Sequence, residues 1–258
     1  MARRTRDTRL PAPFLKRLTL LEGDRPAEYP FDLPWLTGDF ELTFQQPVTI
    51  FMGENGTGKS TLLEAIAALS GYDEAGGGKG YHLVDHSDAI DTSGANLGQH
   101  LRAAWLPKVT RGWFFRAESF FSIARQLDVA ARDVDRPAPD FLSYSHGEGF
   151  IRLFQERMDR QGIYFMDEPE SALSPRRQIE LLRQLATIQE SASSQVILAT
   201  HSPLLMAVPG AELLKFSHRG IDRIDLRDTD HFRLFQSFTV DPDDFVTQAL
   251  NDDLDSLI

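Results

Sequence analysis

The sequence contains no cysteine and no run of apolar residues long enough to cross a membrane. The absence of cysteine excludes a disulfide framework, a thiolate metal site and a cysteine nucleophile. A transmembrane helix needs roughly 18 or more consecutive apolar residues, so we expect no membrane span. The basic N-terminus is followed by prolines rather than by an apolar segment, so we expect no signal peptide. These absences favour a soluble cytoplasmic protein.

Basic residues are also scarce. The chain has 27 Lys and Arg against 38 Asp and Glu, which gives a formal net charge of −11. An acidic chain has no general attraction to nucleic acid. However, residues 1–17 hold six basic residues and one acidic residue, whereas residues 241–258 hold six Asp and no Lys or Arg. The basic arm, residues 1–13, is therefore the candidate for contact with DNA, and a solvated terminus is the alternative interpretation.

The chain of 258 residues has room for one large α/β domain, or for a core with a small subdomain. Short strand-like stretches alternate with stretches whose apolar residues recur at helical spacing. Strands are expected over residues 14–22, 40–52, 101–106, 111–117, 163–166, 195–199, 212–217 and 221–226. Helices are expected over residues 60–69, 119–140 (ending in a loop), 148–159, 175–190 and 229–250. We expect two hairpins, 101–117 and 212–226. The alternation predicts an α/β sandwich, without internal repeats or sustained heptads.

The strongest functional pattern is G-x-x-x-x-G-K-S, which runs from Gly53 to Ser60 between an apolar strand and a helix. Glycines allow backbone N–H groups to point at phosphate oxygens, and the helix N-terminus adds a partial positive charge. Lys59 can reach the β- and γ-phosphates of a nucleotide, and the Ser60 hydroxyl can ligate Mg²⁺. The candidate nucleotide-binding residues are Gly53, Glu54, Asn55, Gly56, Thr57, Gly58, Lys59, Ser60 and Thr61.

Two carboxylates, Asp167 and Glu168, directly follow the apolar strand Ile163–Met166. Asp167 is placed to serve Mg²⁺, and Glu168 can polarise an attacking water as a general base. By itself this pattern is equally typical of an acidic junction between a strand and a loop. Together with the phosphate loop, it favours a catalytic pair.

Two further patterns indicate function only through their position in the chain relative to the first two. Ser145 and Glu148 form an S-x-x-E capping box for the helix that follows. A helix N-terminus with a free hydroxyl can also bind the γ-phosphate of a nucleotide held by another subunit. Farther along, the buried strand Gln195–Ala199 leads to His201, whose imidazole can sense a γ-phosphate and hold water.

Taken in this order, the four patterns resemble those of the ATP-binding-cassette (ABC) ATPases. Gly53–Ser60 is similar to the Walker A loop and Ile163–Glu168 to Walker B. Ser145–Glu148 is similar to the signature motif, Ser171–Ser174 to the D-loop, and His201 to the switch histidine. Within this superfamily, the chain looks more like the soluble branch than like transporters. The stretch Trp113–Glu118 is similar to small stand-alone bacterial ATPases.

The resemblance covers about residues 14–228. It implies a P-loop NTPase fold, an ABC-type sandwich with a RecA-like core, an antiparallel β subdomain and a small helical lobe at about 119–160. Residues 229–258 would add a C-terminal helix and an acidic tail. The implied activity is hydrolysis of ATP to ADP and phosphate with Mg²⁺ as cofactor, in a homodimer that forms on ATP binding. The implied site residues are Glu168 and His201 for catalysis, Ser60, Asp167 and Glu118 for the metal, and Ser145, Gly147 and Glu148 for ATP held by the other subunit.

The sequence departs from the ABC pattern at several positions. His146 replaces the usual first glycine of the signature motif, and Ser174 replaces the usual aspartate of the D-loop. No clear Q-loop glutamine is present; Glu118 stands at the expected place, and Gln99 is the other candidate. No aromatic residue is evident for stacking on adenine. The missing heptads exclude the long coiled coil of chromosome-condensation and repair ATPases.

Alternative functions remain open at this stage. One is the ATPase subunit of a membrane transporter, although the missing Q-loop glutamine argues against it. Another is a nucleotide-gated interaction module with little turnover. A soluble switch ATPase in DNA maintenance or defence is the leading hypothesis, and the effector can be DNA or a protein partner. His82 and His86 lie four residues apart, but no third ligand supports a metal site there.

Overall fold

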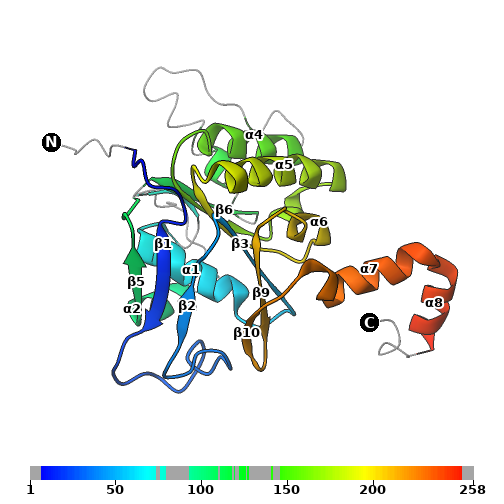
Figure 1. The fold of residues 1–258 in the computed structure, drawn as a ribbon, viewed down its shortest axis with the longest axis horizontal. Coiled ribbons are helices and arrows are strands. Elements are labelled where there is room, and N and C mark those ends of the chain that lie inside the picture. The colour runs from blue at the N-terminus through cyan, green and yellow to red at the C-terminus, as the bar shows by residue number, and fades with distance from the viewer. Residues whose placement is uncertain are drawn as a thin grey trace.

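The computed structural model describes residues 7–73, 76–79, 93–109, 111–117, 119, 122–125, 127, 141 and 146–251. Its centre is a seven-stranded sheet in the order β10-β9-β3-β8-β7-β6-β4 (Figure 1). Neighbouring strands from β9 to β6 run parallel, and β10 and β4 add antiparallel edges. The strands are β3 (Val48–Gly53), β4 (Gly77–Gly78), β6 (Gly112–Arg116), β7 (Ile163–Asp167), β8 (Gln195–Ala199), β9 (Glu212–Ser217) and β10 (Gly220–Arg223).

A second, antiparallel sheet has the order β2-β1-β5. It consists of β1 (Leu15–Leu20), β2 (Glu41–Thr43) and β5 (Leu101–Trp105). The stretch expected as one strand over 40–52 is therefore two strands, β2 and β3, which belong to different sheets. The mixed α/β architecture with an antiparallel subdomain is as predicted.

The expected hairpin over residues 101–117 is wrong. β5 pairs with β1 in the small sheet, whereas β6 pairs with β7 and β4 in the large sheet. β6 lies in the large sheet because its apolar side chains are buried on both faces. Trp113, Phe114 and Phe115 are at most 7% exposed, which a strand with one face in water does not allow. The second expected hairpin is confirmed by the antiparallel pair β9 and β10.

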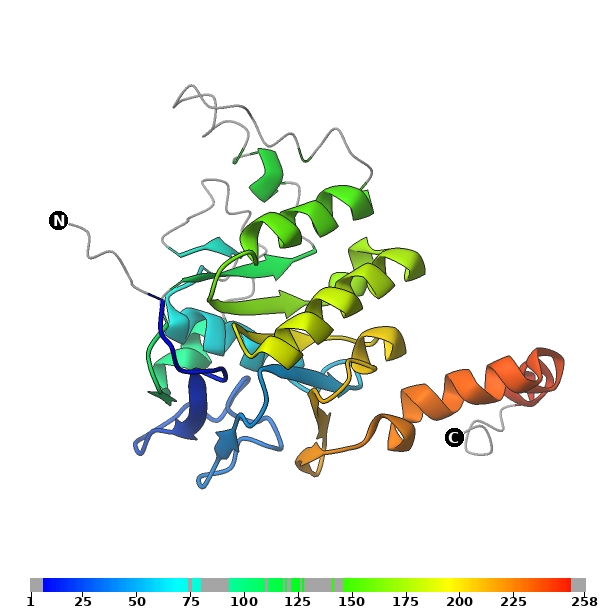
Figure 2. The same ribbon diagram turned by 45° about the horizontal axis from the view of Figure 1, so that its top comes forward.

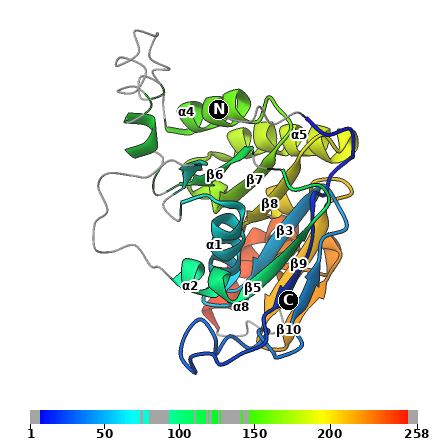
Figure 3. The ribbon, with the colours of Figure 1, turned by 90° about the vertical axis from the view of Figure 1, so that its left-hand side faces the viewer.

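Helices cover both faces of the large sheet (Figure 3). On one face lie α1 (Lys59–Ser70) and α2 (Ser93–Gln99). On the other lie α4 (His146–Arg157), α5 (Pro175–Ser191) and the short α6 (Pro203–Met206). Strand residues alternate between the two cores: Ile50 and Met52 of β3 face the α4–α5 side, and Phe51 faces the α1 side. The nucleotide-loop helix and the signature helix are thus on opposite faces of the sheet.

The predicted C-terminal helix is two helices, α7 (Asp230–Val240) and α8 (Pro242–Leu250). The break falls at Asp241, which caps α8 by accepting a hydrogen bond from the Asp244 N–H, and Pro242 begins the new helix. Neither helix contains a buried residue, and together they project from the body of the protein (Figures 1 and 2). None of the helices in the described part of the chain is long and apolar enough to cross a membrane.

Candidate nucleotide-binding site

Three of the predicted patterns, namely the phosphate loop, the pair Asp167 and Glu168, and His201, meet at one edge of the large sheet. β3, β7 and β8 are parallel neighbours, so their carboxyl ends lie together. β3 leads into the loop Glu54–Gly58, β7 ends at Asp167, and β8 is followed by Thr200 and His201. In open α/β sheets this edge is the usual place for ligands. The three parts of the site are therefore brought together by the order of the strands.

The phosphate loop depends on glycine at defined positions. Gly53, Gly56 and Gly58 have φ values of 138°, 77° and 85°. A Cβ atom on Gly53 would lie 2.3 Å from the backbone oxygen of Phe216, and one on Gly58 would lie 2.8 Å from Leu33. The loop is curled tightly, and the segment between β1 and β2 packs against it. In that segment the Trp35 Nε1–H donates to the Thr57 backbone oxygen at 2.7 Å.

Lys59 is folded back into this loop. Its Nζ donates to the backbone oxygens of Gly53 and Glu54 at 2.9 and 2.8 Å, and the residue is only 5% exposed. Burial lowers the pKa of Lys59 from its ordinary value, while the charges of Glu168 and Asp167 act in the opposite direction. The ammonium group is thus held at the centre of the loop, beside the two acidic residues that follow β7.

The Ser60 hydroxyl donates to Asp167 Oδ1 at 2.9 Å. This bond joins the first turn of α1 to the end of β7, so the two oxygens expected to serve Mg²⁺ are neighbours. A further residue, Arg116 at the end of β6, was not anticipated. Its guanidinium lies 2.8 Å from Glu64 Oε1 and 3.6 Å from Asp167 Oδ2, and all three side chains are at most 15% exposed.

Glu168 adopts a left-handed conformation, with φ 44° and ψ 54°. Its N–H donates to the Ala199 oxygen at 3.0 Å, and its side chain is 48% exposed. The carboxylate Oε1 lies 3.9 Å from His201 Nε2. The two predicted catalytic side chains are therefore neighbours, and Glu168 is accessible to water.

Glu170 is a second unanticipated residue. Its Oε1 accepts a hydrogen bond from the His201 backbone N–H at 2.6 Å. Burial raises the pKa of Glu170. Burial also lowers the pKa of His201, with a smaller contribution in the same direction from Lys59. A neutral imidazole beside the ammonium group is the expected state near neutral pH.

His231 is the third unanticipated residue, and it comes from the C-terminal helix α7. Its ring centroid lies 5.7 Å from that of His201. Burial lowers the pKa of His231, and the charge of His201 acts in the same direction. No motif in the sequence marks this contact, since the two histidines are 30 positions apart and meet only through the hairpin of β9 and β10.

Thr61, in the first turn of α1, is 6% exposed and forms a hydrogen bond with the Tyr29 hydroxyl. Tyr29 itself is 44% exposed. No sequence motif marks this tyrosine, which lies in the Pro- and Gly-rich segment before the phosphate loop. The contact places an exposed aromatic side chain next to the phosphate-loop helix.

Two of the three predicted signature residues, Gly147 and Glu148, lie on the other face of the sheet. Gly147 and Glu148 are in the first turn of α4, and Glu148 Oε1 lies 2.5 Å from Arg177 Nη2 of α5. The D-loop stretch begins beside Glu168, since the Ser171 hydroxyl donates to the Glu168 oxygen at 2.7 Å. Ser145 and Glu118 lie outside the described residues, and so do His82 and His86. Gln99 is exposed at the end of α2.

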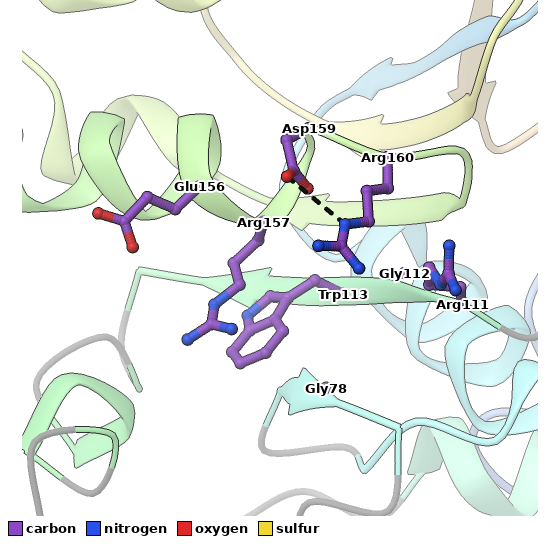
Figure 4. A pocket seen from close by; sticks show the side chains of 8 residues that line it. All are labelled: Gly78, Arg111, Gly112, Trp113, Glu156, Arg157, Asp159 and Arg160. Atoms are coloured by element: carbon purple, nitrogen blue, oxygen red, sulfur yellow. Dashed lines mark ion pairs between the residues drawn. The ribbon is translucent and has the colours of Figure 1, made fainter. Parts of the chain in front are cut away.

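A separate cavity of about 340 Å³ lies at the opposite, amino end of β6. Figure 4 shows Trp113 at its centre, with the Arg157 guanidinium 4.8 Å from the indole ring. Its lining residues are Gly78, Arg111, Gly112, Trp113, Glu156, Arg157, Asp159 and Arg160. None of these belongs to the candidate nucleotide site, so the two features are distinct.

Two family models match separate parts of the sequence. Residues 31–104, which contain the phosphate loop, match an "AAA domain". Residues 135–207, which contain Asp167, Glu168 and His201, match "AAA domain, putative AbiEii toxin, Type IV TA system". The two models cover the phosphate loop and the acidic residues at the end of β7, and they support ATP hydrolysis by this chain. No curated protein matches its sequence.

Solved structures similar to this ATPase include a metal-chelate type ABC transporter in an inward-facing conformation. It is 17% identical, with 84% of this chain and 86% of that chain aligned and a TM-score of 0.47. The SMC head domain from Thermotoga maritima is 13% identical over 83% of this chain and 100% of that chain, with a TM-score of 0.46.

Proposed function

We propose that the ATPase hydrolyses Mg-ATP at composite sites between two copies of the chain, and that closure of the two copies serves as a conformational switch. The observation that carries the proposal is the cluster at the carboxyl edge of the sheet. There Lys59, Ser60, Asp167, Glu168 and His201 come from three separate segments and lie next to one another. The effector of the switch, DNA or a protein partner, is not specified by this cluster.

The residues present fit a nucleotide with its metal ion. The Gly53–Gly58 loop would surround the phosphates with backbone N–H groups, and Lys59 would exchange its two carbonyl partners for phosphate oxygens. Within the described residues, no group of three or more His, Asp or Glu side chains could hold a metal ion. Ser60 and Asp167 would therefore hold Mg²⁺ together with phosphate oxygens and water, which is typical for this ion. When bound, Mg²⁺ neutralises charge on the phosphates.

Glu168 is proposed as the base that takes a proton from the attacking water. Its side chain is accessible to water, and its backbone is fixed by the bond from its N–H to the Ala199 oxygen. His201 would position that water and contact the γ-phosphate. Glu170 would keep the histidine in place, because it accepts the His201 backbone N–H.

The arrangement of the helices supports a site shared between copies. α1 and the phosphate loop lie on one face of the sheet, and α4 with Gly147 and Glu148 lies on the other (Figure 3). A two-fold axis would allow α4 of each copy to approach the phosphate loop of the other, which gives two equivalent sites. Ser145, Gly147 and Glu148 are then the proposed contacts across the interface.

Light scattering on the Glu168→Gln variant tests this proposal. The substitution keeps the shape of the side chain and removes the base, so bound ATP would persist and hold the two copies together. We expect a dimer with ATP and Mg²⁺, a looser species with ADP, and loss of the dimer when Mg²⁺ is chelated. Glu190→Gln, at an exposed position on α5, is the control and should hydrolyse ATP at the wild-type rate. A Glu168→Gln protein that stays monomeric in saturating ATP would contradict the shared site.

A further inference from the structure

α7 and α8, residues Asp230–Leu250, form what we call the C-terminal arm. Its base is fixed to the body. Thr229 is fully buried and its hydroxyl caps α7 by accepting the Phe232 N–H, and Lys215 Nζ lies 2.7 Å from Asp230 Oδ2. His231 in the first turn packs beside His201. The arm therefore starts from a rigid point next to the candidate switch histidine.

Beyond its base, the arm exposes several large apolar side chains to solvent. Five of its apolar residues are exposed: Phe235, Phe238, Val240, Val246 and Leu250, with exposed fractions from 43% to 81%. Phe238 contacts Phe245 of α8, so the two helices are joined by an aromatic pair. Several exposed apolar side chains on one projecting helix pair are typical of an interaction surface.

The direction of the arm points to its partner. In Figure 2 the arrows of the parallel strands point toward the side of the molecule on which α7 and α8 lie. The arm thus extends beyond the carboxyl edge of the sheet, where the nucleotide site is. In the proposed function this edge faces a second copy of the chain, so an arm that projects past it must run along that copy.

A matching surface exists on the chain itself. Arg176, Ile179 and Arg183 of α5 are exposed and lie at positions i, i+3 and i+7, on one face of the helix. Ile179 is 41% exposed. The arm contains four aspartates and one arginine, so it is acidic where this stripe is basic. The N-terminal turn of α5 is also tied to the nucleotide site, since the Ser202 hydroxyl donates to Gln178 Oε1 at 2.6 Å.

We infer that the C-terminal arm of each copy docks on the α5 surface of the other copy when the ATPase closes on ATP. This inference rests on the proposed function, because it needs the closed dimer. The docked arm would add apolar and acidic contacts between the two copies to the contacts made through ATP. His201 of the nucleotide site contacts His231 at the base of the arm, so a change at the nucleotide site can move the arm directly.

The absence of cysteine from the chain allows a clean test. Phe235→Cys on the arm and Ile179→Cys on α5 are made separately in the Glu168→Gln protein, mixed, and treated with a bifunctional maleimide. We expect a cross-linked dimer with ATP and Mg²⁺ that is absent with ADP. Leu106→Cys replaces Ile179→Cys in the control mixture. Leu106 is 60% exposed and directly follows β5, and Figure 1 shows β5 on the opposite side of the molecule from α7 and α8.

The failure of this inference can be separated from the failure of the proposed function. If light scattering shows a dimer but the Phe235→Cys and Ile179→Cys mixture cross-links no better than the Leu106→Cys control, the docking of the arm is wrong and the dimer stands. If no dimer forms with ATP, the proposed function fails and the inference fails with it. As a second readout, Phe235→Ser combined with Arg176→Glu should raise the dissociation constant of the ATP-bound dimer about tenfold. An unchanged constant would overturn the inference.

Discussion

At the scale of single residues, Lys59 is the residue whose charge we propose as essential for nucleotide binding. Its ammonium group makes two hydrogen bonds inside the phosphate loop, and both positions can be taken over by phosphate oxygens. Lys59→Ala should weaken ATP binding about 100-fold or more, because charge-assisted hydrogen bonds to the phosphates are lost. Calorimetry measures the affinity. Lys108→Ala, in a loop beside Trp105, is the control, and wild-type affinity in the Lys59→Ala protein would overturn the assignment.

Arg116 is expected to matter for stability. Its guanidinium lies between Glu64 and Asp167, whose side chains are 7% and 10% exposed. Arg116→Met would leave two buried carboxylates without this partner and should cost about 3 kcal/mol of the free energy of unfolding. Urea denaturation of the nucleotide-free protein measures this. Arg17→Met breaks an exposed pair with Glu41 and should cost less than about 0.5 kcal/mol; equal effects of the two substitutions would contradict this interpretation.

His231 should make stability depend on pH. Burial lowers its pKa in the folded protein, so the unfolded chain binds the proton first as the pH falls. Its contribution to stability is therefore complete above about pH 6.5 and is lost as the pH falls from there toward the lowered pKa. The melting temperature of the His231→Gln protein should fall less than that of wild type when the pH is lowered from about 8 to about 5.5. Arg233→Gln on the same helix leaves His231 in place and should follow wild type.

These residues also show what a sequence can reveal about a site. Lys59, Ser60 and Asp167 could be proposed from the sequence because each stands at a fixed offset within a local motif, and the structure brings Ser60 and Asp167 into contact. Arg116 and His231 could not be found in this way. Arg116 meets Asp167 only through the register of β6 and β7, and His231 meets His201 only through the path of the chain after β8.

At the scale of secondary-structure elements, β3 and β9 pack so closely at Gly53 that a side chain there would separate them. Gly53 and Gly56 both have positive φ, but only Gly53 is crowded, because its Cβ would lie 2.3 Å from the Phe216 backbone oxygen. Gly53→Ala should cost about 3 kcal/mol, since the two strands must separate. Gly56→Ala has no atom within 4 Å of the new methyl group and should cost about 1 kcal/mol. Thermal or urea unfolding of both variants checks the difference, and equal costs would show that backbone strain alone decides.

The elements themselves were predictable to different degrees. The strands Ile163–Asp167 and Gln195–Ala199 are buried along their whole length, and each contains four consecutive apolar residues, 163–166 and 196–199, which identified them. The strands that β5 and β6 pair with could not be predicted, because two adjacent strand patterns joined by a loop with proline are typical of a hairpin. In the structure the two strands belong to different sheets. The choice between sheets is made by burial on both faces of β6, which depends on residues far away in the sequence.

At the scale of the whole molecule, the central claim is that each ATP site combines the phosphate loop of one copy with the signature helix of another. This claim follows from the placement of α1 and α4 on opposite faces of the sheet. Lys59→Ala damages the first half of a site, and Ser145→Arg places a bulky charge in the second half. Each variant alone has damage in both sites of its dimer and should be inactive.

The most direct measurement is the ATP turnover of a mixture of these two variants. In a mixed dimer, one site receives both substitutions and the other receives neither, so one intact site is restored. Random pairing makes half of the dimers mixed, and we expect the mixture to recover about a quarter of the wild-type turnover. Native mass spectrometry with ATP confirms that mixed dimers form. Mixed dimers that are as inactive as either variant alone would contradict the shared site.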